Sequence, residues 1–224
     1  MSYSLKSPQL IYILSEKSYL GAKNLPVIKI NYYDRDIDLS KFDALIFTSK
    51  NGVEAIDRVG DEWKEKEIYS IGSGTSKTIT KKGVTPFYTA KSSYGDDFAK
   101  EIKDKIKDKK VLFLRAKVVT SKLNEILRSN GIELSEEIVY ETICNSDELS
   151  APEDGSVIIF SSPSTIECFF KRFNWLKSYK AVVIGSKTAG FMPKNIKYIL
   201  SKKQTIPACI ELAKNLTLSQ NGVK

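Results

Sequence analysis

The sequence predicts an α/β protein with two parallel-sheet domains of the Rossmann or flavodoxin type. One domain is inserted into the other, and a two-stranded hinge joins them. Short apolar runs alternate with amphipathic segments, as in βαβ units. Two landmarks recur at one common offset. Ile46-Phe47-Thr48-Ser49 returns as Ile159-Phe160-Ser161-Ser162, and Ile71-Gly72-Ser73-Gly74-Thr75 returns as Ile184-Gly185-Ser186-Lys187-Thr188. The chain therefore uses one structural unit twice.

The first part of the chain opens with a continuous apolar run at 11–14, which is typical of a buried strand. A second run at 27–30 follows Pro26, and the polar stretch 34–40 has no periodicity, so we expect it to cross between domains. From there strands and helices alternate up to residue 140, and glycines close two of the helices. The expected strands are 44–47, 68–71, 85–88, 111–114 and 137–140, and the expected helices are 52–59, 76–82, 97–106 and 123–129.

The second part begins after an acidic break at 144–155, which holds Pro152 and Asp154-Gly155. Four large apolar residues then fall at helical spacing between Ile166 and Phe173. A last helix is expected to start near Pro207. The remaining expected elements are strands 157–160, 181–184 and 196–200 and a helix from Thr188.

The repeat also predicts the domain connectivity. A strand–helix–strand unit at 111–140 follows the first copy, whereas the second copy ends the chain, and a comparable strand pair stands at 11–33. We therefore expect domain A to combine residues 1–33 with 145–224, and domain B to be residues 41–139. Segments 34–40 and 140–144 are the expected crossing linkers, and we expect the domains to close on a ligand about them.

Composition bounds the function. The net charge of +8 indicates a polyanionic partner, either nucleic acid or a small molecule with several carboxylates or phosphates. The chain has no histidine, so acid–base work falls to other groups and an imidazole metal site is excluded. Cys168 and Cys209 fall on apolar helix faces, so we expect reduced core cysteines, no disulfide and no zinc. The start of the sequence has no signal-like or membrane-spanning run, which predicts a cytoplasmic protein that binds no membrane.

Polar motifs follow four of the expected strands, at the edge where open parallel sheets bind ligands. Hydroxyls and backbone N–H groups at a helix start attract anions, although Ser and Thr are also simply favoured caps. Arg115 ends the strand 111–114, where it is either a bidentate carboxylate clamp or an ordinary surface arginine. The candidate substrate-binding residues are Thr48, Ser49, Asn51, Gly72, Ser73, Thr75, Arg115, Ser161, Ser162, Ser164, Gly185, Ser186, Lys187 and Thr188.

Four motifs, taken in order, resemble the uroporphyrinogen-III synthase family. They are Phe47-Thr48-Ser49-x-x-Gly52-Val53, Val139-Tyr140-Glu141-Thr142, Phe160-Ser161-Ser162-Pro163-Ser164 and Ile184-Gly185-x-x-Thr188-Ala189. The resemblance extends over nearly the whole chain, from Ile11 to Leu216. One departure is Ser15-Glu16-Lys17, which stands where the family often has a Thr-Arg-Pro-like turn.

The resemblance implies a lyase of haem biosynthesis that needs no cofactor. It would close hydroxymethylbilane, a linear tetrapyrrole octa-acid, to uroporphyrinogen III, with loss of water and inversion of ring D through a spiro intermediate. Holding a flexible polyanion in the productive shape is the main task of such an enzyme. The resemblance also places Tyr140 facing the cleft, as a candidate catalytic proton donor. Its alternative is a hinge tyrosine that packs by its ring.

The expected partner is this small molecule, without nucleic acid. The lack of an obvious extra apolar patch makes a monomer the default, and a transient contact with the preceding enzyme of the pathway stays open. Two other classes also stay open. One is a nucleic-acid-binding protein, although basic residues interleaved with aromatics are not evident. The other is a two-domain protein that binds a polyanion without catalysis.

Overall fold

The computed structural model describes residues 10–92 and 94–218 of the chain, which divides into two compact units. Unit 1 is formed by the two ends of the chain, up to Lys29 and from Ile143 onward, and unit 2 is Ile30–Thr142. One α/β unit is thus inserted into another, as predicted. The first boundary precedes the polar segment 34–40 that we expected to cross. That segment instead belongs to unit 2, where it leads into the 3₁₀ turn η1 (Leu39–Lys41).

Unit 1 is built on a five-stranded sheet in the order β11-β10-β9-β1-β2, and its four strand pairs are parallel. Its central strand reads Val-Ile-Ile-Phe and is buried on both faces. Ile158 and Phe160 pack toward α5, while Val157 and Ile159 pack toward α7. The elements of unit 1 are β1 (Ile11–Ile13), β2 (Lys23–Asn24), β9 (Val157–Phe160), α5 (Pro163–Arg172), β10 (Lys180–Val183), α6 (Ser186–Ala189), β11 (Tyr198–Leu200) and α7 (Ile206–Leu218).

Unit 2 is built on a six-stranded sheet in the order β3-β8-β7-β4-β5-β6. Its apolar side chains alternate between two layers, so that Leu112 and Leu114 pack with α1 and α2 while Phe113 packs with α3 and α4. The elements are β3 (Ile28–Tyr32), η1, β4 (Ala44–Phe47), α1 (Lys50–Ile56), η2 (Glu62–Glu65), β5 (Glu67–Ile71), α2 (Gly72–Lys81), β6 (Tyr88–Ala90), α3 (Gly95–Ile102), β7 (Lys110–Ala116), α4 (Leu123–Ser129) and β8 (Glu133–Cys144).

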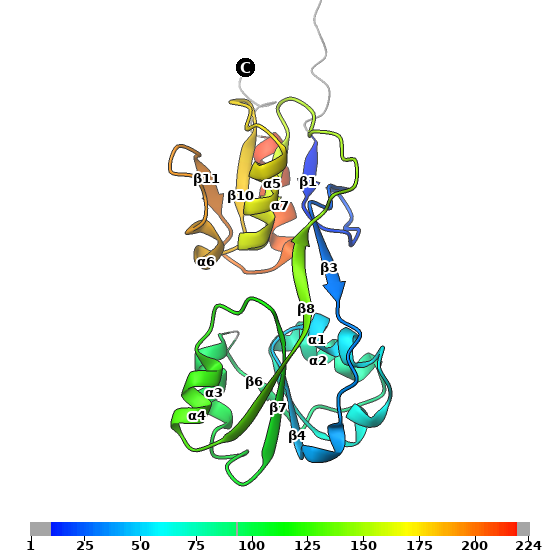
Figure 1. The fold of residues 1–224 in the computed structure, drawn as a ribbon. Coiled ribbons are helices and arrows are strands. Elements are labelled where there is room, and N and C mark those ends of the chain that lie inside the picture. The colour runs from blue at the N-terminus through cyan, green and yellow to red at the C-terminus, as the bar shows by residue number, and fades with distance from the viewer. Residues whose placement is uncertain (1–9, 93, 219–224) are drawn as a thin grey trace, which may run out of the picture. The chain divides into compact units, whose positions relative to one another are not determined.

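Two neighbouring strands, β3 and β8, carry the chain between the units (Figure 1). Their backbone hydrogen bonds run from Tyr33 N to the Val139 carbonyl at 3.0 Å and from Asn145 N to the Val27 carbonyl at 2.9 Å. This register is antiparallel. Two paired strands therefore connect the units, as predicted, but the first is Ile28–Tyr32 and not the expected segment 34–40. β3 does not extend the sheet that contains β1, where the two-residue strand β2 stands instead.

Several element boundaries differ from the expected ones. α2 begins at Gly72 rather than at Ser76, and the turn after β10 forms a single helical turn, Ser186–Ala189, that starts before Thr188. β6 (Tyr88–Ala90) starts three residues later and ends two residues later than the expected strand 85–88. Gly190 and Pro193 follow α6 closely, and neither residue favours a longer helix. No helix in the described part of the chain is long and apolar enough to cross a lipid bilayer.

Gly52 lets α1 pack closely on β7. A Cβ atom at this position would lie 3.0 Å from the carbonyl oxygen of Leu114 and 3.4 Å from the ring of Phe47. We expect Gly52→Ala to lower the free energy of unfolding by ~1–3 kcal/mol in urea denaturation, because the core there is already filled. The control is Gly74→Ala in α2, whose Cβ would meet no atom within 4 Å. It should leave stability unchanged or raise it by ~0.5–1 kcal/mol. Equal losses in both variants would contradict the packing argument.

Candidate functional site

The four polar motifs lie at the carboxyl ends of two pairs of neighbouring strands. β4 and β5 are adjacent in unit 2, and β9 and β10 are adjacent in unit 1. In unit 2 the strand order reverses between β4 and β7, and in unit 1 it reverses between β9 and β1. Such reversal points open the crevice in which parallel α/β sheets bind ligands. Each unit therefore presents the same kind of edge, with two helix starts side by side.

In unit 1, the start of α5 is held by a capping box. Ser162 Oγ accepts a hydrogen bond from Thr165 N at 3.3 Å, and Ser162 N donates to Thr165 Oγ1 at 3.2 Å. Pro163 occupies the first helical turn, where its missing N–H costs nothing. Ser161 and Ser164 are half-buried beside this cap. Ser162 therefore has a structural role in the cap that a ligand role would have to share.

The second helix start of unit 1 belongs to α6. Gly185 precedes it, and a Cβ there would lie 3.2 Å from the side chain of Gln204. Ser186 and Lys187 are exposed, whereas Thr188 is 5% exposed. Backbone N–H groups, a hydroxyl and an ammonium group therefore gather within one turn at the end of β10.

Unit 2 presents the starts of α1 and α2. Ser49 caps α1 by accepting a hydrogen bond from Asn51 N at 3.2 Å, and Thr48 beside it is half-buried. α2 differs, because no side chain caps its first turn and Gly72 takes a φ of +71° there. The first N–H groups of a helix without such a cap need another hydrogen-bond acceptor. Within this turn Ser73 is exposed and Thr75 is buried.

Tyr140 is aimed by a β-bulge. The pairing of β7 with β8 shifts after Arg115, so that Ile138 pairs with Arg115 while Tyr140 pairs with Ala116. As a result Val139 and Tyr140 both pack in the core layer next to α1. The Tyr140 side chain is 6% exposed. Burial raises the pKa of its phenol above the ordinary value of 10.0, and a hydrogen bond with Ser49 offsets this only in part.

Arg115 is engaged within unit 2. Its Nε lies 2.5 Å from Glu136 Oε2, and its Nη1 donates to the carbonyl of Ala116 at 2.9 Å. Glu136 also pairs with Arg128 Nη1 at 2.8 Å and accepts a hydrogen bond from Asn124 at 3.1 Å. Burial alone would raise the pKa of Glu136, but these donors and the two guanidinium charges hold it below its usual range. This geometry favours a structural role for Arg115 over the carboxylate clamp.

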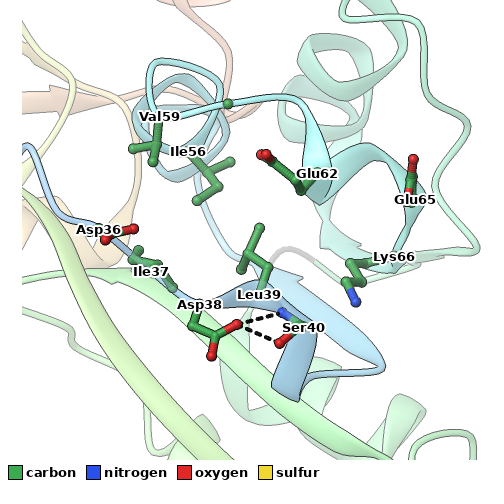
Figure 2. A pocket seen from close by; sticks show the side chains of 11 residues that line it. Asp36, Ile37, Asp38, Leu39, Ser40, Ile56, Val59, Glu62, Glu65 and Lys66 are labelled. Atoms are coloured by element: carbon green, nitrogen blue, oxygen red, sulfur yellow. Dashed lines mark hydrogen bonds between the residues drawn. The ribbon is translucent and has the colours of Figure 1, made fainter.

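Unit 2 also has a cavity of about 410 Å³ away from these motifs (Figure 2). It is lined by η1 and the residues before it, by the end of α1 and by η2. These segments precede β4 and β5, so the cavity lies at the amino ends of the strands and contains none of the predicted site residues. Asp38 at its rim already accepts hydrogen bonds from Ser40 N and Oγ. Among the residues that the structure describes, no group of three His, Cys, Asp or Glu side chains is placed to hold a metal ion.

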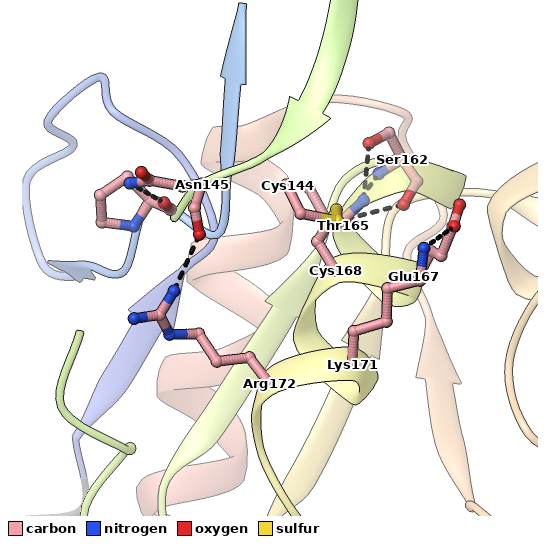
Figure 3. Close-up of a disulfide and its surroundings, with 9 residues drawn as sticks. Cys144, Asn145, Ser162, Thr165, Glu167, Cys168, Lys171 and Arg172 are labelled. Carbon is pink, nitrogen blue, oxygen red and sulfur yellow. Dashed lines mark hydrogen bonds and ion pairs between the residues drawn. A yellow bond between two sulfur atoms is a disulfide. The ribbon is translucent and has the colours of Figure 1, made fainter. Parts of the chain in front are cut away.

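The prediction that the cysteines are all reduced is wrong for two of them. Cys144 and Cys168 form a disulfide in unit 1 (Figure 3). Cys209 is free and buried against the sheet. The two partners belong to different elements, β8 and α5, and their approach depends on the path of the crossing strand. A helical-face argument considers each cysteine alone, so it could not find this pair.

Comparisons with known proteins agree on one family. The sequence model of "Uroporphyrinogen-III synthase HemD" matches residues 18–211. A porphyrin biosynthesis protein HemD of Ruminiclostridium josui is 27% identical over 191 residues. That match covers 78% of this chain but 38% of the relative, so the chain spans well under half of that protein's length. A uroporphyrinogen-III synthase of Chlorobaculum parvum is 26% identical over 176 residues, covering 70% of this chain and 72% of that protein.

The fold is also found in solved structures. The crystal structure of uroporphyrinogen-III synthetase from Helicobacter pylori matches with a TM-score of 0.81 at 29% identity, covering 93% of this chain and 99% of that one. The arrangement of strand-end motifs described above therefore lies on a scaffold shared with that enzyme. The family match extends over most of the sequence, including both units and the hinge strands. The chain belongs to the uroporphyrinogen-III synthase family.

Proposed function

We propose that this chain cyclises hydroxymethylbilane to uroporphyrinogen III, with loss of water and inversion of ring D through a spiro intermediate. One observation carries the proposal. In each of the two sheets, two neighbouring strands are followed by adjacent helix starts that are rich in hydroxyl and N–H groups. Eight carboxylates on a flexible chain need many such donors. Because ring closure without inversion proceeds unaided, positioning is the larger part of the catalytic task.

The proposed carboxylate ligands are the strand-end residues of both units. Helix N-termini favour anions, and the uncapped start of α2 and the exposed Lys187 beside Thr188 add donors. Arg115 is left out, because two of its three guanidinium nitrogens already have partners within unit 2. The ligand set is Thr48, Ser49, Asn51, Gly72, Ser73 and Thr75 of unit 2 with Ser161, Ser162, Ser164, Gly185, Ser186, Lys187 and Thr188 of unit 1.

Tyr140 is the proposed proton donor to the departing hydroxyl group. A phenol is protonated at neutral pH, as a donor requires, and burial raises the pKa of Tyr140 further from the ordinary value of 10.0. Ser49 Oγ accepts from Asn51 N and gives its own proton to the Tyr140 oxygen, so Ser49 can meet a substrate carboxylate only through its backbone N–H. A donating Ser49 leaves the phenolic proton of Tyr140 available to the substrate. We further propose that the enzyme is a lyase, that it acts as a monomer in the cytoplasm, and that it makes a transient contact with the preceding enzyme of the pathway.

Incubation with hydroxymethylbilane, followed by oxidation and separation of the porphyrin isomers, tests this function. The proposal predicts that isomer III exceeds the isomer I formed in a protein-free control. A polyanion-binding protein without catalysis would leave the isomer ratio of the control unchanged. Tight, salt-sensitive binding of nucleic acid with no isomer III would instead support the nucleic-acid alternative.

Thr188→Ala is expected to weaken substrate binding more than it slows catalysis. Its hydroxyl lies in the first turn of α6, where it can hold a carboxylate that folds the substrate for the spiro step. We expect KM to rise about 10–100-fold, as for the loss of one hydrogen bond to a charged group, and the share of isomer I to increase. Thr85→Ala, at an exposed loop residue before β6, is the control and should match the wild type. An unchanged KM and isomer ratio would remove Thr188 from the ligand set.

A further inference from the structure

A disulfide joins the end of β8, one of the two strands that connect the units, to helix α5 of the proposed site. Cys144 is the last residue of β8, just past the boundary between the two units, and Cys168 lies in the middle of α5. Figure 3 shows the bond between the Ser162–Thr165 capping box at one end of α5 and Arg172 at the other. The bond therefore connects the crossing strand to the helix whose first turn carries candidate carboxylate ligands.

Hydrogen bonds also connect the segment after β8 to α5, independently of the disulfide. Arg172 Nη1 donates to the carbonyl of Asn145 at 2.8 Å, and its Nη2 donates to the carbonyl of Asp147. Asn145 in turn donates from Nδ2 to the carbonyl of Pro26 at 2.8 Å and from its backbone N to Val27. These bonds need no sulfur–sulfur bond. Opening the disulfide should therefore loosen the end of β8 on α5 without unfolding unit 1.

We infer that Cys144–Cys168 is a reversible thiol–disulfide exchange site whose reaction partner is a dithiol reductant. In a compartment that keeps thiols reduced, such as the cytoplasm proposed above, a protein disulfide is usually transient and either catalytic or redox-sensing. The two cysteines are not equally buried. Cys144 is half-buried next to Ile143, which is 40% exposed, whereas Cys168 is 4% exposed. Attack therefore takes place at Cys144.

The exchange balances as a two-electron, two-proton step. A thiolate of the reductant attacks the Cys144 sulfur, forms a mixed disulfide and releases Cys168 as a thiolate, which takes up a proton. The second thiol of the reductant then attacks its own sulfur in the mixed disulfide and releases Cys144, which is protonated in turn. The protein gains two thiols and the dithiol becomes a cyclic disulfide. The same couple run backwards reoxidises the pair.

Opening the bond has a measurable effect on stability. The disulfide closes a loop that contains β9 and the acidic segment before it, with a sequence separation of 24, and so restricts the unfolded chain. We expect the reduced protein to melt about 5–15 °C below the oxidised protein. We also expect faster proteolysis between residues 143 and 156 in the reduced form, because this stretch loses its covalent tie to α5 and keeps only the hydrogen bonds from Arg172.

Equilibration of the full chain in buffers of reduced and oxidised dithiothreitol, followed by counting of free thiols in denaturant, tests the inference. The three cysteines predict one thiol at the oxidised end, from Cys209, and three at the reduced end, with a single two-electron transition between them. Cys144→Ser should show no transition and no redox-dependent change in melting temperature. Cys209→Ser is the matched control, which should keep both effects while losing one thiol throughout.

A thiol count that stays constant across the whole series would overturn the inference, and so would a transition that leaves the melting temperature unchanged. Both outcomes are measured on the wild-type protein, so they do not depend on whether a variant folds. A further measurement, which rests on the proposed function, is that KM for hydroxymethylbilane should be about 3–10-fold higher in the reduced form, as ~1 kcal/mol of lost binding implies. If neither form turns over this substrate, the proposed function fails while the thiol count and melting curves still decide the exchange site.

Discussion

Tyr140→Phe is expected to lower kcat by ~100-fold or more while leaving the fold and product affinity intact, because general acid catalysis is typically worth ~10²–10⁴-fold. The substitution removes one hydroxyl from a side chain that is 6% exposed and keeps the ring that packs against α1. Steady-state turnover of hydroxymethylbilane gives kcat, and circular dichroism with urea denaturation checks the fold. Tyr198→Phe is the control, since Tyr198 lies exposed on β11 at the far edge of the sheet of unit 1.

The raised pKa of Tyr140 adds a second readout. A phenol that titrates above 10.0 stays protonated throughout the neutral range, so its contribution to kcat should be constant there and fall only in strongly alkaline solution. The ratio of wild-type to Tyr140→Phe activity should therefore not change between about pH 6 and 9. A fall in kcat of less than about threefold would assign the proton to water or backbone, because that corresponds to well under ~1 kcal/mol of transition-state stabilisation. Tyr140 would then be a hinge residue that packs by its ring.

Arg115→Ala is expected to lower the free energy of unfolding by about 3 kcal/mol, as for the loss of one partner of a largely buried ion pair. The two side chains are only 19% and 12% exposed, and the substitution leaves the Glu136 carboxylate with less compensation. Thermal melting should show a fall of about 6–12 °C for a chain of this size. The exposed pair Lys171–Glu167 on α5 is the matched control, and Lys171→Ala should cost less than ~0.5 kcal/mol.

The ion pair also predicts a pH dependence. The folded state lowers the pKa of Glu136, so the stabilisation is present above the unfolded value of 4.5 and is lost as the pH falls through and below it. The stability difference between the wild type and Glu136→Gln should therefore shrink below pH 4.5. If Arg115 clamps a substrate carboxylate instead, Arg115→Ala would raise KM strongly and leave the melting temperature nearly unchanged. That result would return Arg115 to the ligand set.

The sequence predicts most of the architecture because the repeated motifs and the apolar runs are local signals. Val157–Phe160 is apolar at every position, so its burial on both faces of a sheet follows directly. Ser49 and Ser162 were found for a similar reason, since hydroxyl residues after a buried strand favour helix starts. What these signals cannot distinguish is a cap from a ligand, and the structure shows that both serines serve as caps.

The remaining features depend on contacts between elements. The bulge at Val139 that aims Tyr140 arises from the hydrogen-bond register between β7 and β8, which no single strand encodes. Arg115 finds Glu136 on the neighbouring strand, so the end of its own strand gives no sign of that partner. Cys144 meets Cys168 only because the crossing strand returns to unit 1 beside α5. Such contacts between elements can be identified only when the three-dimensional fold is known.

The central claim is that the chain directs ring inversion and does not merely bind a polyanion. The most direct measurement is a single turnover of hydroxymethylbilane with the protein in molar excess, quenched and oxidised before the spontaneous reaction proceeds. We predict that nearly all of the porphyrin is isomer III and that it forms faster than isomer I does without protein. A product that is mainly isomer I, formed at the protein-free rate, would contradict the account.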